Sequence, residues 1–365
     1  MRLVFIVTTL VCLLTTPGAC DLHPSSEQIL LVQHDASTHT PSNRSISPSL
    51  FVELEELARI VDITYCVGAL GLGIQKPFEC PSRCKDFKGF ELVTTWNTGP
   101  LLSDSCGYIA LSHPPSPPRI IIAFRGTYSI TNTVADLSSM PQAYAPYPGD
   151  GNSTARSDSP KCYNCTVHTG FYTSWRHTRD EILPHVYKAL EKYPEYQVTL
   201  VGHSLGGAVA AFAALEMLDC GLQPTVTTFG EPRIGNAALT EYINLRFKLT
   251  SNHTSDLNNQ SYRRVTHISD PVPLLPLDEW GYAPHGGEIF ISNPDIPPEI
   301  QDIYHCDGNA DPKCIVGPED NGWNIPNRFK LWQLFFAHRD YFWRLGLCLP
   351  GNDFFWRGEE EAQLH

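Results

Sequence analysis

A serine between two glycines is the residue in this sequence best placed to act as a nucleophile. Gly202, Ser204 and Gly206 form a Gly-x-Ser-x-Gly motif, with an apolar, β-branched run at 198–201 before it and small residues after it. This order is typical of a strand, a sharp turn and a helix. The serine in such a turn has a strained backbone, and side chains in place of the glycines would clash. We therefore expect the Ser204 hydroxyl at the carboxyl edge of a sheet, beside helix amides that can bind an anion.

A serine hydroxyl becomes a good nucleophile only when a base takes its proton and an acid orients that base. In hydrolases with this turn, the acid and then the histidine follow the serine along the chain. Asp270 fits this order, because it follows the β-branched strand pattern of residues 262–268 and Pro271 ends that strand. Its carboxylate is expected at the same edge of the sheet as Ser204. A strand-ending turn aspartate without a catalytic role is the alternative.

Four histidines follow Asp270, namely His285, His305, His338 and His365. His365 is the last residue, and His305 lies beside a cysteine in a loop where a disulfide is a better interpretation than a metal site. His285 lies in a glycine-rich loop that suits a catalytic group, whereas His338 lies near the end of the predicted core. The residues alone leave both open, and we prefer His338.

Acyl transfer also requires hydrogen-bond donors for the negative oxygen of the transition state. The amide of Leu205, the residue after the nucleophile, is one expected donor. The second should come from a loop after an earlier strand, and Thr127 closely follows the strand pattern of residues 119–124. Thr127 could donate both its amide and its hydroxyl. A plain turn at the end of that strand is the alternative.

The composition indicates an exported globular protein. Its 365 residues are 42% hydrophobic, enough for a well-buried core, and the net charge of −13 disfavours nucleic acid and anionic membranes as partners. Residues 1–20 have the pattern of a signal peptide, and no later apolar run is long enough to span a bilayer. Twelve cysteines and several Asn-x-Ser/Thr sites fit a disulfide-bonded glycoprotein. We expect a secreted, extracellular protein without stable membrane insertion.

The rest of the chain divides into a propeptide or flexible arm at residues 21–47, a single domain at 48–350 and an acidic tail at 351–365. Within the domain, a first helix capped by Ser49 precedes strands and helices that alternate beyond residue 105. Further strand patterns span 92–96, 107–111, 225–230 and 288–291, and helical patterns span 50–65, 171–193, 234–247 and 332–343. This alternation predicts an α/β fold with a mostly parallel central sheet flanked by helices.

Four motifs taken together are more specific than the serine motif alone. They are Phe124-Arg125-Gly126-Thr127, Gly202-His203-Ser204-Leu205-Gly206-Gly207, Ser269-Asp270-Pro271-Val272-Pro273 and His338-Arg339-Asp340-Tyr341-Phe342. The order and spacing of these motifs resemble those of the fungal class 3 lipases, and the resemblance covers residues 48–350. The resemblance implies an α/β-hydrolase fold and hydrolysis of carboxylic esters, with no metal or cofactor. It implies Ser204 as nucleophile, Asp270 as orienting acid, His338 as general base, and Thr127 and Leu205 as oxyanion-hole donors.

The resemblance also implies a set of disulfides. The pairs carried over from the family are Cys66–Cys348, Cys80–Cys84 and Cys162–Cys165, with Cys306–Cys314 similar to a pair in some yeast relatives. Cys106 and Cys220 are left without an assigned partner.

A lid is the last feature that the resemblance implies. In this family a short helix after the oxyanion residue covers the site and opens at an oil–water interface. Residues 129–139 match that segment, and Ile130, Val134 and Leu137 would form its inward face. Thr133 stands near the place where some relatives have a tryptophan, so the strength of interfacial activation is left open.

We expect a secreted triacylglycerol lipase, a monomeric serine esterase that releases fatty acids from lipid at an oil–water interface through an acyl-enzyme. A feruloyl or other non-lipid carboxylesterase on the same fold is the alternative, and the apolar lid pattern favours lipid. A non-catalytic binding protein would not need the complete set of serine, aspartate, histidine and oxyanion residues. A metal-dependent hydrolase would need a ligand cluster that the sequence does not suggest.

Overall fold

The computed structural model describes residues 44–68, 73–99, 104–127, 141–146, 160–249, 257–317 and 336–348. The predicted signal peptide, the arm up to residue 43 and the acidic tail lie outside these ranges. So does the predicted lid with Ile130, Val134 and Leu137. The unit described below lies within Arg44–His365.

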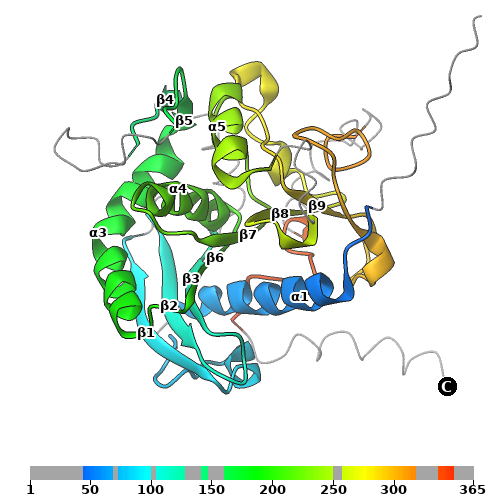
Figure 1. Ribbon diagram of the computed structural model, residues 1–365. Helices are drawn as coiled ribbons and strands as arrows, with labels where there is room; N and C mark the ends of the chain where they lie inside the picture. The colour runs from blue at the N-terminus through cyan, green and yellow to red at the C-terminus, as the bar shows by residue number, and fades with distance from the viewer. Residues whose placement is uncertain are drawn as a thin grey trace, which may run out of the picture. The chain divides into compact units, whose positions relative to one another are not determined.

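An eight-stranded sheet forms the centre of this unit (Figure 1). Its strands, in spatial order, are β1 (Phe90–Asn97), β2 (Cys106–Ser112), β3 (Arg119–Phe124), β6 (Gln197–His203), β7 (Thr225–Phe229), β8 (Tyr262–His267), β9 (Glu288–Ile291) and β10 (Ile303–His305). The pairs from β3 to β9 are parallel, and the pairs at both ends of the sheet are antiparallel. This confirms the predicted mostly parallel sheet. Because β3, β6, β7 and β8 run the same way, the loops after them meet at one edge.

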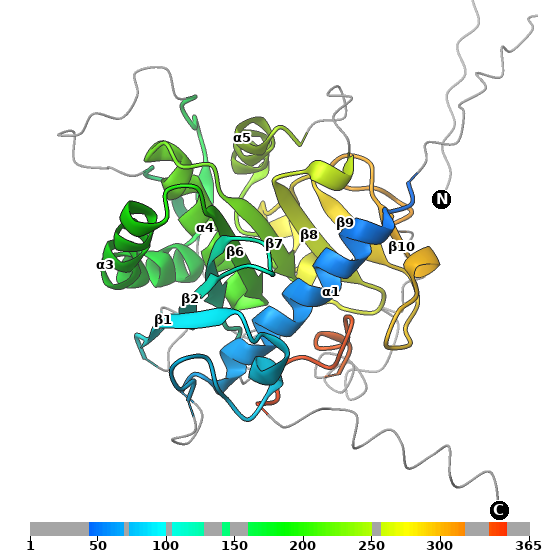
Figure 2. The ribbon, with the colours of Figure 1, turned by 60° about the horizontal axis from the view of Figure 1, so that its bottom comes forward.

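Helices cover both faces of the sheet (Figure 2). Helix α1 (Pro48–Ile63) packs on one face, and α3 (Thr169–Lys192), α4 (Leu205–Asp219) and α5 (Ala237–Phe247) pack on the other. The alternation of side chains along β3 shows the two faces directly. Ile120 and Ile122 belong to the core with α3 and α4, whereas Ile121 and Ala123 belong to the core with α1. A strand buried on both faces reads as a continuous apolar run, as residues 119–124 do.

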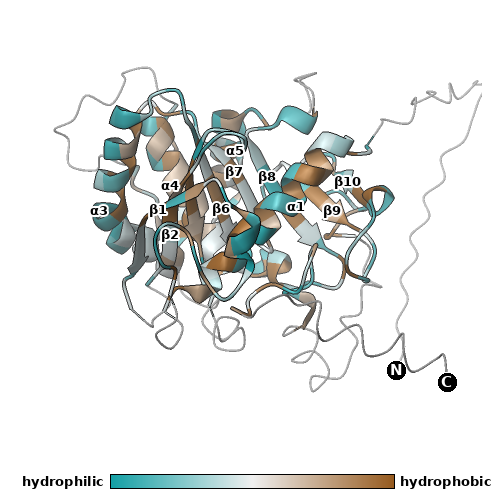
Figure 3. Cartoon of the chain, turned by 90° about the horizontal axis from the view of Figure 1, so that it is seen from below, coloured by the Kyte–Doolittle hydropathy of each residue, from teal (hydrophilic) through white to brown (hydrophobic). Residues whose placement is uncertain are grey.

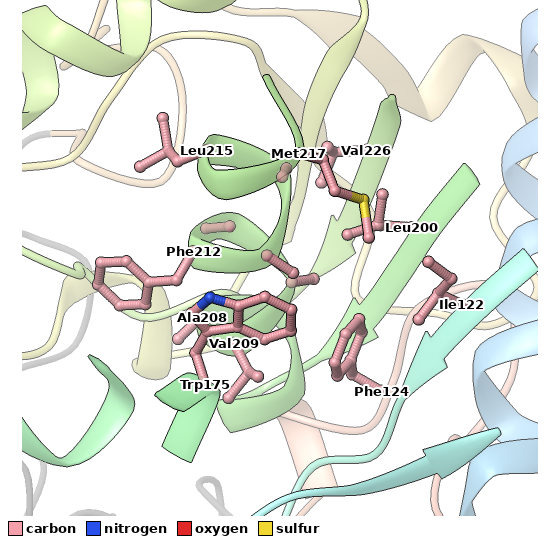
Figure 4. Packing of buried hydrophobic residues seen from close by; sticks show 14 of the residues in the cluster. Ile122, Phe124, Trp175, Leu200, Ala208, Val209, Phe212, Leu215, Met217 and Val226 are labelled. Atoms are coloured by element: carbon pink, nitrogen blue, oxygen red, sulfur yellow. The ribbon is translucent and has the colours of Figure 1, made fainter. Parts of the chain in front are cut away.

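Helix α4 is buried on all sides, from Leu205 to Met217. Such a helix is expected to be apolar all round, and Figure 4 shows its side chains packed against Trp175 and the strands. Helix α3, by contrast, is hydrophilic on its outer side and hydrophobic toward α4 (Figure 3). None of the helices within the described ranges is both long and apolar enough to cross a membrane.

The start of the domain differs from the prediction in two details. Ser47, not Ser49, caps α1, because its hydroxyl accepts a hydrogen bond from the Leu50 amide (3.2 Å). The arm was predicted to extend to residue 47, but Arg44 bonds to Asp311 (2.6 Å) and Ser45 forms a β-bridge with Tyr304. These partners lie more than 250 positions away, so local sequence could not reveal them.

One buried charge lies between α3 and α4. Glu216 is 4% exposed and accepts hydrogen bonds from Trp175 Nε1 (2.7 Å) and from the guanidinium of Arg179 (2.7–3.1 Å). A buried carboxylate is tolerated only when it is paired and hydrogen-bonded, so Arg179 is expected to be needed for the packing of these helices.

Replacing Arg179 with Met should lower the free energy of unfolding by about 2–4 kcal/mol, because Glu216 would stay buried without its counter-ion. Arg176→Met is the matched control on the exposed side of the same helix and should change it by less than about 0.5 kcal/mol. Urea unfolding followed by fluorescence measures both. Equal losses in the two variants would contradict the assigned role of Arg179.

Candidate active site

The turn between β6 and α4 holds Ser204 in an unusual backbone conformation, with φ 57° and ψ −130°. Its amide donates to the carbonyl of Phe229 at the end of β7 (2.9 Å). A Cβ on Gly202 would overlap the backbone of Gly206, and a Cβ on Gly206 would overlap the carbonyl of Phe124 at the end of β3. Both positions therefore require glycine, as the motif predicted, and the neighbouring strands fix the turn.

Asp270 and His338 form a buried pair. Nδ1 of His338 lies 3.0 and 2.9 Å from the two carboxylate oxygens of Asp270. His338 is 0% exposed and Asp270 is 1% exposed. Since an ionised carboxylate only accepts, Nδ1 carries a hydrogen, and in the neutral form of the ring Nε2 then has a free lone pair. Nε2 is buried and has no hydrogen-bond partner within the described part of the chain. It is thus available to accept a proton.

Two further groups orient the Asp270 carboxylate. The Tyr341 hydroxyl donates to Oδ2 (2.6 Å), and the Val272 amide donates to Oδ1 (2.9 Å). Burial, and next the charge of Asp270, raise the pKa of Tyr341 well above 10, so this hydroxyl keeps its proton and remains a donor. Tyr341 lies in the motif that follows His338, but its local sequence carries no signal for this contact.

Gly230 shows how closely these groups approach the serine turn. It follows β7 with φ +62°, and a Cβ there would lie 2.7 Å from the Tyr341 hydroxyl, 2.8 Å from Cε1 of His338 and 3.0 Å from Oδ2 of Asp270. Gly230 directly follows the residue whose carbonyl holds the Ser204 amide. The structure therefore brings Ser204, Asp270 and His338 to one edge of the sheet. Sequence reasoning missed Gly230, although a glycine at the end of a parallel strand was a usable signal.

Residues 125–127 lie against the serine turn. A Cβ on Gly126 would be 2.9 Å from Cβ of Ser204 and 2.5 Å from the Tyr65 hydroxyl. The hydroxyl of Thr127 is buried and has no hydrogen-bond partner within the described ranges. On the other side, Leu205 begins α4, so its amide belongs to the unsatisfied donors at a helix N-terminus. Donors from both segments can thus serve a negatively charged oxygen beside Ser204.

His285, the alternative base, belongs to a different buried network. Its Nε2 lies 3.1 Å from Oε1 of Glu231, and its Nδ1 lies 2.9 Å from the carbonyl of Gly286. The hydroxyls of Thr228 and Tyr262 donate to the other oxygen of Glu231 (2.6 and 2.9 Å). Burial lowers the pKa of His285, and both of its ring nitrogens already face acceptors in this network, so neither is directed at Ser204.

The loop that carries His338 is irregular. Of the helix predicted over residues 332–343, residues 332–335 lie outside the described ranges, Phe336 and Ala337 are helical, and the prediction is wrong from His338 onward, where a turn begins. The loop is fixed from the end of α1, where Asp62 accepts a hydrogen bond from the Gly346 amide (2.9 Å). Aromatic spacing alone predicted helix, whereas these contacts with a distant part of the chain hold the loop.

Among the cysteines that the structure describes, four disulfides are present, and they are the pairs that the resemblance implied: Cys66–Cys348, Cys80–Cys84, Cys162–Cys165 and Cys306–Cys314. Cys106 is buried and free, and Cys220 is exposed and free. In the described part of the chain, Glu288, Cys306 and Cys314 have possible metal-ligand atoms within 4.8 Å of one another. The two sulfurs are bonded to each other, so neither is a thiolate that could bind a metal.

A parallel sheet with a serine at a strand–turn–helix and an Asp–His pair at the same edge defines the α/β-hydrolase class. Residues 121–280 match the family model described as "Lipase (class 3)". The chain is 46% identical over 387 residues to the "Secreted mono- and diacylglycerol lipase 2" of Gibberella zeae, covering 95% of this chain and 93% of that protein. It is 49% identical over 362 residues to "Lipase A" of Sodiomyces alcalophilus, covering 87% of this chain and 86% of that protein.

Among solved structures, the Lip2 lipase of Yarrowia lipolytica superposes with a TM-score of 0.72 at 29% identity, covering 84% of this chain and 97% of that one. The chain belongs to the class 3 lipase family. It is a secreted lipase, a carboxylic ester hydrolase of α/β-hydrolase fold that acts on lipid. The family model ends before His338.

The buried anchor Asp62 makes stability depend on pH. Burial raises its pKa from 3.8 to about 6, against smaller opposing effects of the Gly346 amide and Arg83. Between these two values the folded protein binds more protons than the unfolded chain, so stability falls as pH rises from about 4 to about 6. A shift of this size corresponds to about 3 kcal/mol.

Asp62→Asn should remove this loss, because the amide oxygen can still accept from Gly346 and carries no charge. The stability difference between Asp62→Asn and the parent protein should therefore grow in favour of the variant by about 2–2.5 kcal/mol from pH 4 to pH 7, since part of the full effect has already developed at pH 4. Urea unfolding at four pH values measures it. A difference that stays constant over this range would contradict the assignment.

Proposed function

We propose that Ser204, His338 and Asp270 are the catalytic triad of an acylglycerol hydrolase, and that Thr127 and Leu205 form its oxyanion hole. The observation that carries the proposal is the orientation of His338. Its Nδ1 is held by Asp270, and its Nε2 is left without a partner among the described residues, at the edge where the serine turn lies. This is the arrangement that a general base for a serine nucleophile requires.

The proposed reaction has two half-reactions. Nε2 of His338 takes the proton of Ser204 as Oγ attacks the ester carbon, and Asp270 stabilises the imidazolium that forms. The amides of Thr127 and Leu205 and the Thr127 hydroxyl stabilise the tetrahedral oxyanion. His338 then protonates the departing glycerol oxygen, which leaves an acyl-enzyme on Ser204. Water, activated by the same histidine, releases the fatty acid and restores the serine.

Triacylglycerol is the first candidate substrate, as the sequence predicts, and mono- and diacylglycerols are the second. A relative that is 46% identical over almost its whole length is named a mono- and diacylglycerol lipase, which favours these substrates as a second candidate. The two relatives reported above are both named lipases, which favours glycerides over a feruloyl ester. Since every proposed catalytic group comes from one chain, we also propose that the monomer is active.

The purified protein should release fatty acid from emulsified triolein, diolein or monoolein faster than it cleaves a soluble feruloyl ester. Ser204→Ala should abolish both this release and labelling by a fluorophosphonate, since the nucleophile is lost. Fatty-acid titration and mass spectrometry of the labelled peptide measure these results. Release from di- and monoolein alone would favour the second candidate, and preference for the feruloyl ester, or full activity of Ser204→Ala, would overturn the proposal.

Replacing Thr127 with Val should lower kcat on a soluble short-chain ester by about 100-fold, because the variant keeps the shape but loses the hydroxyl donor. Thr127→Ser is the matched control, since it keeps the hydroxyl, and it should stay within about 10-fold of the parent protein. Steady-state rates on the same ester measure both. A similar kcat for Val and Ser at this position would argue that the hydroxyl takes no part in stabilising the oxyanion.

A further inference from the structure

We propose that His203 is a positioning residue that fixes the backbone of His338 relative to Ser204, and that Tyr65 selects the tautomer in which it does so. The inference rests on the proposed triad, and it assigns roles to two residues outside it. His203 occupies the first of the two variable positions of the Gly-x-Ser-x-Gly motif, directly before Ser204, and it is 1% exposed.

The hydrogen bonds of His203 settle its tautomer. Its Nε2 lies 2.8 Å from the main-chain carbonyl of His338, and its Nδ1 lies 2.6 Å from the hydroxyl of Tyr65. A carbonyl oxygen only accepts, so Nε2 must carry the hydrogen. A neutral imidazole has one N–H, so Nδ1 accepts from the Tyr65 hydroxyl. The tyrosine thereby holds the ring in the form that donates to His338.

The neutral state of His203 also matters for its neighbour. The two imidazole rings are 4.7 Å apart between centroids, at an angle of 31°. Burial, and next the proximity of His338, lower the pKa of His203 well below 6.5. A neutral ring at this distance does not oppose the positive charge that His338 gains when it takes the serine proton. A protonated His203 ring, in contrast, would repel the positive charge on His338.

The hydrogen bond from His203 holds His338, the residue of the site that no described helix or strand fixes. Ser204 is set by β6 and α4, whereas His338 lies in an irregular loop. The bond from His203 is made to the carbonyl of His338, so the histidine ring remains free for Asp270 and the serine. Because the same residue is covalently joined to Ser204, one side chain sets the spacing of nucleophile and base. A misplacement of about 1 Å at such a site can cost about 100-fold in rate.

The test uses His203→Leu, which removes the donor, and His203→Gln, whose amide nitrogen can replace Nε2. With a soluble short-chain ester, and with rates normalised to Ser204 titrated by a fluorophosphonate, His203→Leu should lower kcat about 10- to 100-fold and leave KM within about 3-fold. His203→Gln should recover at least about 3-fold of that loss. A role in folding alone would lower the titrated fraction or the melting temperature but leave kcat per titrated site unchanged.

Tyr65→Phe tests the second half of the proposal. It should lower kcat about 3- to 10-fold, and the double variant Tyr65→Phe/His203→Leu should be no slower than His203→Leu, because the hydroxyl acts only through the histidine. The matched control is His113→Leu, which removes another histidine bonded to a tyrosine hydroxyl (Tyr196, 2.7 Å) at the opposite edge of the sheet. It should keep kcat.

The outcomes separate this inference from the proposed function. If the parent protein is not labelled at Ser204, or if Ser204→Ala remains active, the triad itself is wrong. If the triad holds but His203→Leu keeps its kcat per titrated site, the positioning role of His203 is wrong. If the losses from Tyr65→Phe and His203→Leu multiply in the double variant, the assignment of Tyr65 as the residue acting through His203 is wrong.

Discussion

The close approach of three backbone segments at the serine turn is the constraint on which the site depends. The backbone of Ser204 has a positive φ, which few residues other than glycine adopt. It is held there because its amide is bonded to the end of β7, while Gly206 lies directly on the end of β3. A strained residue persists only when its surroundings over-determine it. The turn is thus made by its neighbours as much as by its own sequence.

Parallel pairing explains how groups far apart in the sequence come to share this edge. Thr127 follows β3, Ser204 follows β6, Gly230 follows β7 and Asp270 follows β8, and these four strands are neighbours in the sheet. The connection after each of these strands returns to the opposite edge before the next of them begins, so the loops that directly follow these four strands reach the same side. The site is therefore a property of the topology, and its residues need no proximity in the chain.

This is also why the sequence could predict some parts of the site and not others. Ser204, Thr127 and Asp270 each follow a buried strand with a clear pattern, so both the strand and the edge could be predicted from local residues. No strand pattern leads directly into His338 in the sequence, so local reasoning preferred it but left His285 open. The resemblance to a family favours His338, and the structure shows a physical difference between the two: His338 pairs with Asp270, whereas His285 pairs with Glu231.

The position of His338 depends on the end of α1, almost 300 residues earlier in the chain. Three residues at or just after the end of α1 hold its loop: Asp62 through the Gly346 amide, Tyr65 through His203, and Cys66 through its disulfide with Cys348. Desolvation of the Asp62 carboxylate costs stability when it is charged, so this anchor is not an optimum for folding. Asp62 is instead placed where it can fix the loop that carries His338. An irregular loop can hold a catalytic side chain in place only when rigid elements fix it at several points, and the first helix and the end of β6 supply those points.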